Sequence, residues 1–85
     1  MAYKVIIAKS AAKSLNALPK KFQVRVIGVI DLLSENPYPP ASKKLKGRDG
    51  YRIRTNDYRI LYTIENEILT VTVVAVGHRK EIYKK

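Results

Sequence analysis

The feature that most constrains the fold is a proline cluster near the middle of the chain, Asn36-Pro37-Tyr38-Pro39-Pro40. Proline lacks a backbone N–H and clashes with the preceding turn of a helix, and the residue before it favours extended backbone. Helices therefore end at this segment, which divides the 85-residue chain into two parts. The hydrophobic period differs on its two sides, so we expect different secondary structure before and after it.

The residues before the cluster predict one strand and two helices. Tyr3 to Ile7 is aromatic and β-branched, which is typical of a strand. Ser10 is expected to cap a first helix that Pro19 separates from a second. The apolar positions of the first helix are Ala11, Ala12, Leu15 and Leu18, and those of the second are Phe22, Val26, Val29, Ile30 and Leu33. Gly28 interrupts the second helix, where we expect it to permit close approach to another helix or to the sheet.

The residues after the cluster predict three further strands. They are Tyr51 to Thr55, Tyr58 to Ile64 and Leu69 to Val76, and the short polar segments between them suit tight turns. Short turns favour antiparallel neighbours. We therefore expect one α+β domain over residues 1–85 with the order β-α-α-β-β-β. Its two N-terminal helices would pack on one face of a mostly antiparallel sheet and leave the opposite face charged and concave.

Composition narrows the class of protein. The chain has 17 Lys and Arg against 7 Asp and Glu, a net charge of +10, and no cysteine. These numbers exclude a disulfide scaffold and thiolate metal sites, and they favour an anionic partner. With 46% hydrophobic residues and no apolar run near 20 residues, we expect a soluble, cytoplasmic domain without a membrane segment or targeting signal.

Half of the charge excess lies in one segment, from Lys43 to Arg59. Its seven basic residues against two acidic ones leave 7 − 2 = +5, and they are Lys43, Lys44, Lys46, Arg48, Arg52, Arg54 and Arg59. A solvated surface is sufficient to explain the lysines. The arginines interrupt β-forming runs instead, and period-two alternation places Arg52 and Arg54 on one sheet face. Because the guanidinium fork suits bidentate phosphate contact, we predict that this sheet face binds nucleic acid.

Few other residues suggest catalysis. His78 follows Gly77 at the end of an apolar strand, where active groups are common, although an isolated histidine is more often a surface or packing residue. One histidine and scattered carboxylates predict no metal site and no cofactor. Hydrolysis of RNA requires neither a metal nor a protein nucleophile, since the ribose 2′-OH can attack the adjacent phosphate. Fixed cations and in-line alignment are enough to promote that step.

Three segments stand out together along the chain, namely Leu45 to Arg54, Asp57 to Tyr62 and Val76 to Tyr83. In this order they resemble the RelE-type toxins of the RelE/ParE superfamily. The resemblance implies the toxin of a type II toxin–antitoxin pair, which cuts mRNA in the ribosomal A site and is neutralised by an acidic RelB-like antitoxin in a hetero-oligomer. By this match Arg52 and Arg54 occupy the positions of two basic active-site residues. Arg59 and Arg79 match phosphate-stabilising arginines, and Tyr83 matches a tyrosine that orients the mRNA base.

Further expectations and alternatives follow from this resemblance. Arginine is a poor general base, so His78 is the expected proton acceptor, with Glu81 second. The expected RNA-binding residues are Lys43, Lys44, Lys46, Arg48 and Lys80. Two other functions remain open, namely a ParE-like toxin that poisons DNA gyrase and a non-catalytic basic domain that binds RNA or DNA.

Overall fold

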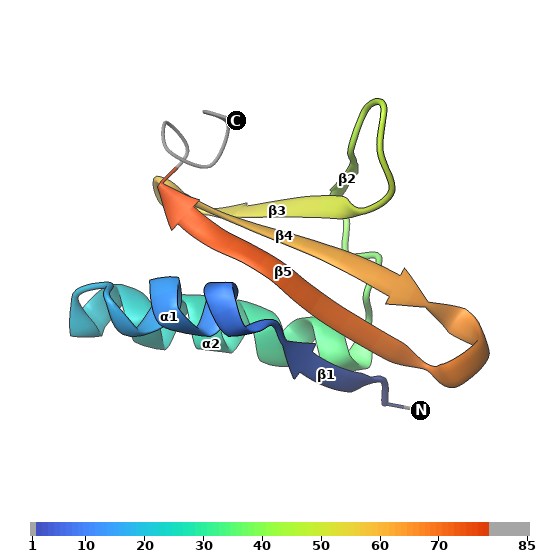
Figure 1. Ribbon diagram of the computed structural model, residues 1–85, viewed down its shortest axis with the longest axis horizontal. Helices are drawn as coiled ribbons and strands as arrows, with labels where there is room; N and C mark the ends of the chain where they lie inside the picture. Colours follow the sequence, from blue (N-terminus) through green and yellow to red (C-terminus); the bar gives the residue numbers. More distant parts are fainter. Residues whose placement is uncertain (1, 79–85) are drawn as a thin grey trace.

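The computed structural model describes residues 2–78 (Figure 1). The elements in order are β1 (Lys4–Ile7), α1 (Lys9–Asn16), α2 (Lys20–Glu35), β2 (Lys43–Lys44), β3 (Tyr51–Thr55), β4 (Tyr58–Glu65), the 3-10 turn η1 (Asn66–Ile68) and β5 (Thr70–His78). One five-stranded sheet has the order β1-β5-β4-β3-β2, in which only β1 and β5 are parallel. The predicted α+β architecture, with two helices against a mostly antiparallel sheet, is confirmed.

Three local expectations are wrong. The lysines at 43 and 44 form the short edge strand β2, where no strand was expected, because they pair with Arg52 and Tyr51 of β3. Ser10 does not cap α1, since the helix begins at Lys9 and Ala8 holds the cap position without a side-chain hydrogen bond. Gly28 does not approach another element either, because a Cβ atom added there meets nothing within 4 Å.

The core lies between the two helices and one face of the sheet, which we call the helix-side face, and α1 supplies Ala11 and Leu15 to it. The predicted stripe of α2 packs inward, with Val26, Ile30 and Leu33 buried. The buried residues that the sheet supplies to this core are Ile53, Ile60, Tyr62, Val71, Val73 and Val76. In Figure 1 the ribbons of both helices lie below the sheet, so no helix within residues 2–78 covers its other face, which we call the open face.

A β-bulge in β5 changes the alternation of its side chains. Leu61 of β4 pairs with Ala75 and the next residue, Tyr62, pairs with Val73, so Val74 is the extra residue. Val73 and Val76 are therefore both buried in the core although three positions separate them. Ala75 consequently faces away from the core, which matters for the site described below.

The proline cluster is anchored to the sheet through tyrosines. The hydroxyl of Tyr62 donates a hydrogen bond of 2.9 Å to the carbonyl oxygen of Pro37, and both residues are buried. The rings of Tyr51 and Tyr62 stack at 5.9 Å, and that of Tyr38 meets Tyr51 edge-on at 5.6 Å. Burial raises the pKa of Tyr62 above its ordinary value of 10.0, and the neighbouring Tyr51 and Tyr38 raise it slightly further.

The loop between β2 and β3 is held by one close contact. The backbone N–H of Leu45 donates to the carbonyl of Gly50 at 2.9 Å. Gly50 has φ of +124°, and a Cβ atom there would lie 3.1 Å from the carbonyl oxygen of Tyr62. Only glycine fits this position without strain, so the loop is fixed against β4. Within residues 2–78, no helix is long and apolar enough to span a membrane.

Candidate functional site

The strand register assembles basic residues on the open face. Arg52 of β3 pairs with Lys43 on one side and Leu61 on the other, and Leu61 pairs with Ala75. Directly paired residues of antiparallel strands point to the same face. The first row across the open face therefore consists of two basic residues beside two apolar ones, in the order Lys43, Arg52, Leu61 and Ala75.

The next row brings two predicted arginines together. Arg54 pairs directly with Arg59, and Arg59 pairs with Gly77 of β5. Arg54 is exposed, whereas Arg59 is half-buried. Like charges placed directly opposite each other destabilise a sheet pair. The second row therefore presents two guanidinium groups on the open face, and guanidinium groups are suited to hydrogen-bonding a phosphate.

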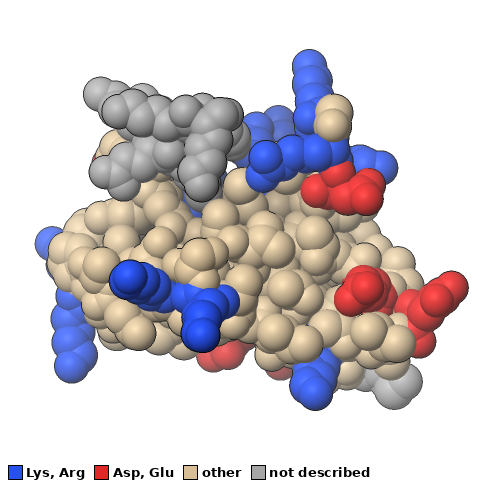
Figure 2. Space-filling view, viewed as in Figure 1, with Lys and Arg blue, Asp and Glu red and all other residues tan. Residues whose placement is uncertain are grey.

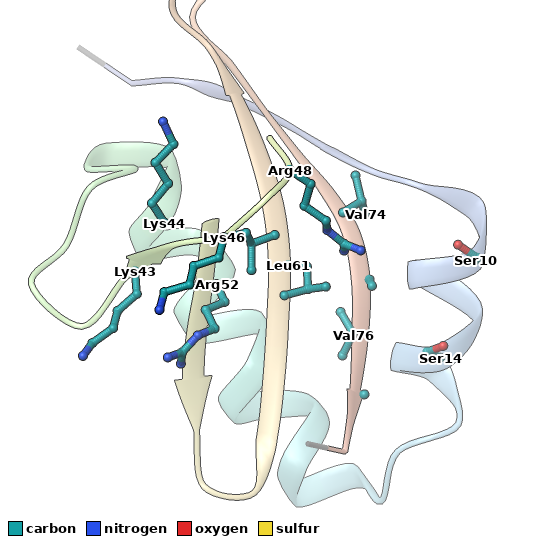
Figure 3. A pocket seen from close by; sticks show the side chains of 13 residues that line it. Ser10, Ser14, Lys43, Lys44, Lys46, Arg48, Arg52, Leu61, Val74 and Val76 are labelled. Carbon is teal, nitrogen blue, oxygen red and sulfur yellow. The ribbon is translucent and has the colours of Figure 1, made fainter. Parts of the chain in front are cut away.

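A groove of about 1010 Å³ lies over the first row. Leu61, Ala75 and Gly77 contribute to its lining from the sheet. Basic residues line one side and the hydroxyls of Ser10 and Ser14, one turn apart on α1, line the other (Figure 3). The charged residues that line the groove are Lys43, Lys44, Lys46, Arg48 and Arg52.

Within residues 2–78, all five charged residues that line the groove are basic, so this part of the groove has charge of one sign. In Figure 3 the side chain of Arg48 extends from the β2–β3 loop across the sheet toward Val74. Figure 2 shows Lys and Arg side chains gathered at the upper right, where Figure 1 places that loop. A concave surface with charges of one sign concentrates the opposite sign, which here favours a polyanion.

His78 lies on the other side of the sheet from these arginines. It pairs with Tyr58, and the two rings meet edge-on at 5.9 Å. The ring of Tyr58 in turn packs at 5.2 Å against Phe22 of α2, which places both rings on the helix-side face. The structure therefore brings Arg52, Arg54 and Arg59 together on one face, and it holds His78 at the end of β5 on the opposite one.

Four of the residues singled out from sequence fall outside the part of the chain that the structure describes. They are Arg79, Lys80, Glu81 and Tyr83. In residues 2–78, no three or more His, Asp or Glu side chains gather as metal ligands. Sequence reasoning missed the contribution of Ser10 and Ser14 to the groove. The signal was their spacing of four residues, which places both hydroxyls on one face of a helix.

Comparison with known proteins gives concordant matches over nearly the whole chain. Residues 5–83 match the family model described as the ParE toxin of the type II toxin–antitoxin system parDE. The chain is 32% identical to toxin RelG of Mycobacterium tuberculosis (strain ATCC 25618 / H37Rv), with 100% of both sequences covered.

Solved structures agree in fold. A chain of the toxin–antitoxin complex RelBE2 from Mycobacterium tuberculosis is similar with a TM-score of 0.83 and 29% identity, covering 93% of this chain and 100% of that one. The isolated Escherichia coli RelE toxin is similar with a TM-score of 0.81 and 29% identity, covering 96% and 92%. The chain belongs to the ParE toxin family of type II toxin–antitoxin systems, within the RelE/ParE toxin superfamily.

Proposed function

We propose that this toxin is a ribosome-dependent endoribonuclease that cuts mRNA in the A site and so inhibits translation. The main support is the basic groove on the open face, beside which Arg54 and Arg59 stand in register. A groove lined by five cations is suited to a single-stranded backbone, and its apolar floor offers a surface to a base. The reaction would take place in the cytoplasm, where ribosomes translate.

The proposed reaction is attack of a ribose 2′-oxygen on the adjacent phosphorus. The P–O5′ bond breaks as the P–O2′ bond forms, which leaves a 2′,3′-cyclic phosphate and a free 5′-hydroxyl. One group accepts the 2′-OH proton, and a proton is delivered to the departing 5′-oxygen. Negative charge grows on the non-bridging oxygens, where Arg52, Arg54 and Arg59 would stabilise it. Arg79 and Tyr83 are proposed to complete the site, the former on the phosphate and the latter against the base.

The proton acceptor is proposed to be His78, with Glu81 second. The register sets His78 beside Tyr58 on the helix-side face, so its imidazole can serve RNA only at the strand end, beyond the edge of β5. We expect His78→Gln to lower the cleavage rate, because the glutamine side chain cannot accept the 2′-OH proton. Cleavage by this variant at the wild-type rate across pH 6 to 8 would exclude His78 as the base.

An acidic RelB-like antitoxin is the proposed partner. The similar chain of RelBE2 comes from a toxin–antitoxin complex, and the groove here has the charge that an acidic segment complements. Occupation of this groove by the antitoxin would exclude mRNA from it, and the two proteins would form a hetero-oligomer. Lys43, Lys44, Lys46 and Arg48 are proposed to contact RNA in the free toxin, together with Lys80.

The test uses ribosomes programmed with a defined mRNA and the purified, antitoxin-free toxin. We expect cuts at the A-site codon with a 2′,3′-cyclic phosphate on the upstream fragment. A single 2′-deoxy substitution at the cut nucleotide should abolish cleavage, because it removes the nucleophile. Arg52→Ala should slow cutting strongly, whereas Lys20→Ala, a charge-matched control at an exposed position on α2, should not. Intact mRNA on ribosomes with wild-type toxin contradicts the proposal.

Inhibition of DNA gyrase is the second candidate, because the matched family model is that of ParE toxins. A gyrase poison would leave the mRNA intact and produce gyrase-linked DNA breaks in a supercoiling assay. The three arginines on the open face favour the ribonuclease, since a protein-directed poison has no need of a phosphate cluster. Measuring both activities on one preparation decides between the two functions.

A further inference from the structure

The helix α1 forms the uncharged side of the groove. β1 pairs with β5 only from Thr70 to Val73, and the chain then turns into α1 at Ala8, whose backbone N–H donates to the carbonyl of Val73 at 2.9 Å. Beyond Val73 no strand within residues 2–78 flanks the outer edge of β5, and α1 packs there with Ala11 and Leu15 buried. A backbone hydrogen bond thus fixes the position of α1 along the groove.

Ser10 and Ser14 are the residues of α1 that line the groove, and both are exposed. The two lysines of α1, Lys9 and Lys13, are not among the described residues of the lining. Within residues 2–78, neither serine hydroxyl is held by a hydrogen bond to the protein, although a serine in a helix often bonds to the carbonyl four residues before it. Both hydroxyls can therefore donate to a ligand and accept from it.

Each serine stands level with one of the two rows of the open face. In Figure 3 α1 runs beside β5 in the same direction, with Ser10 level with Val74 and Ser14 level with Val76. Each of these valines directly precedes the β5 residue of a row, the first and the second respectively. Four residues of helix rise about 6 Å and two residues of strand about 6.6 Å, so the two spacings match. Ser10 therefore accompanies the first row and Ser14 the second.

The two sides of the groove suit different chemical groups. The basic side suits phosphate, whereas a hydroxyl hydrogen-bonds to neutral donors and acceptors. Between the two sides lie the half-buried Val74 and Ala75, which offer an apolar surface. A nucleotide has the same three parts, namely an anionic phosphate, the face of its base and a base edge with donors and acceptors. When its phosphate lies on the basic side, the edge of its base is directed toward α1.

We propose that Ser10 and Ser14 are specificity-determining residues that hydrogen-bond to the base edges of two consecutive nucleotides in the groove. Ser14 is assigned to the base beside the second row, where Arg54 and Arg59 would hold the reacting phosphate, and Ser10 to the neighbouring base. Serine can pair with more than one kind of base edge, so we expect a graded preference of about three- to tenfold. The inference rests on the proposed function, since it takes single-stranded RNA as the substrate.

The first test measures cleavage on programmed ribosomes whose A-site codon is varied. Ser14→Ala should weaken the base preference at the cut nucleotide by about three- to tenfold, and Ser10→Ala at one adjacent position, because each removes one hydrogen bond. Ser10→Thr and Ser14→Thr keep a hydroxyl and should keep the preference. Ser34→Ala, the same change on α2 in a side chain bonded to the carbonyl of Asp31, is the control and should alter neither position. Alanine is the stronger helix former, so these variants should remain folded.

The second test measures RNA binding without catalysis. Fluorescence anisotropy of the purified, antitoxin-free toxin compares oligonucleotides of A, of C and of U with an abasic strand of the same length. The wild type should rank the three bases, and the double variant Ser10→Ala/Ser14→Ala should bind them with dissociation constants within about twofold of one another. Affinity for the abasic strand and the salt slope should not change, because no cation is removed.

A third test locates the base by cross-linking, because the chain has no cysteine. Ser14→Cys introduces a single thiol, which should exchange into a disulfide with an RNA that carries an activated disulfide on a base. Lys46→Cys, on the basic side of the groove, should react instead with an RNA that carries the same group on a phosphate. The opposite pattern would place the base on the basic side.

Four results would overturn the inference. They are equal binding of the three bases by the wild type, unchanged codon preference in both alanine variants, a loss of affinity for the abasic strand in the double variant, and the opposite cross-linking pattern. The proposed function fails separately. A toxin with serine-dependent base preference that leaves mRNA intact contradicts the ribonuclease alone, whereas cutting with unchanged preference in the variants contradicts only the role of the serines.

Discussion

At the scale of single residues, the open face is an arrangement of cations whose roles can be separated. Arg52 lines the groove beside Leu61, whereas Arg54 and Arg59 form the row beyond it. The half-buried Arg59 is held by β4, so its guanidinium is more rigidly placed than the exposed lysines of the β2–β3 loop. Rigid placement favours stabilisation of transition-state charge, and mobile exposed lysines favour attraction of the substrate.

Arg59→Gln is therefore expected to lower the cleavage rate by about 10²-fold with little change in ribosome binding. Glutamine preserves part of the side-chain stem and removes the charge. Single-turnover cleavage on programmed ribosomes measures the rate, and a pelleting assay measures binding. Lys44→Ala serves as the control and should weaken binding more than it slows the bound reaction. If an excess of the Arg59→Gln toxin restores the wild-type cleavage rate, the side chain of Arg59 contributes to substrate binding and not to transition-state stabilisation.

Gly50 is the residue most sensitive to a small substitution. Gly50→Ala is expected to destabilise the protein by about 2 kcal/mol or more, because φ of +124° is strained for alanine and the new Cβ lies 3.1 Å from a backbone oxygen. Gly47→Ala is the matched control, since φ is +74° and nothing lies within 4 Å, and it should cost about 1 kcal/mol. Urea unfolding measures the stability of both variants. Equal losses of stability in Gly50→Ala and Gly47→Ala would contradict the close contact between Gly50 and β4.

At the scale of elements, the sequence predicts repeating patterns well and departures from them poorly. The stripe of α2 and the bounds of β3 follow directly from hydrophobic period. The two-residue strand β2 has no pattern to detect, and it forms because Gly50 turns the chain back onto β3. The bulge at Val74 reverses the alternation inside an unbroken apolar run, so the facing of Ala75 could not be derived from period two.

The candidate site, too, could be predicted from the sequence only where it follows a repeating pattern. Alternation placed Arg52 and Arg54 on one face, and the register added Arg59 opposite Arg54. The separation of His78 from these arginines depends on the shift at Val74, which moves His78 into line with Tyr58. Sequence alone had no access to that shift. The contribution of Ser10 to the groove was not predicted, because a serine at the start of a helix is also a typical helix cap and was interpreted as one.

The contact between the proline connector and the sheet predicts a pH dependence. Burial raises the pKa of Tyr62, so its phenol keeps the proton in the folded state at pH values where the unfolded chain releases it. Stability should therefore fall as pH rises above about 10, toward the folded-state pKa. Tyr62→Phe should lose about 1 kcal/mol at pH 7 with the hydrogen bond to Pro37, and its alkaline decline should be shallower. Urea unfolding of the wild type and of Tyr62→Phe at pH 7 and 10.5 measures these stabilities. An equal loss of stability in both proteins between the two pH values would contradict the prediction.

At the scale of the whole molecule, the charge of +10 is divided unequally between the two faces of the sheet. The open face holds the groove, whose charged lining within residues 2–78 is entirely basic, whereas α2 carries Asp31 and Glu35 as well as Lys and Arg. The groove therefore suits a polyanion, and net charge alone could not have located it.

The groove also predicts a dependence on salt. If about five RNA phosphates are contacted, the slope of log K against log salt should be near −3.5. Titration of a single-stranded RNA oligonucleotide at several potassium chloride concentrations measures this slope. Lys46→Ala should reduce its magnitude by about 0.7, because one phosphate contact is removed. A slope near zero would exclude the groove as an RNA-binding surface.

The pairing of β1 with β5 delays the appearance of a folded toxin during its own synthesis. The register from Lys4 with Thr70 to Ile7 with Val73 leaves the first strand without its neighbour until most of the chain has been made. The groove has the same requirement, since Ala75 and Gly77 form part of its lining. At 5–20 residues per second, the nascent chain exists for several seconds before residue 77 is added. A nascent chain that lacks residues 70–77 therefore has neither the partner of β1 nor the complete lining of the groove.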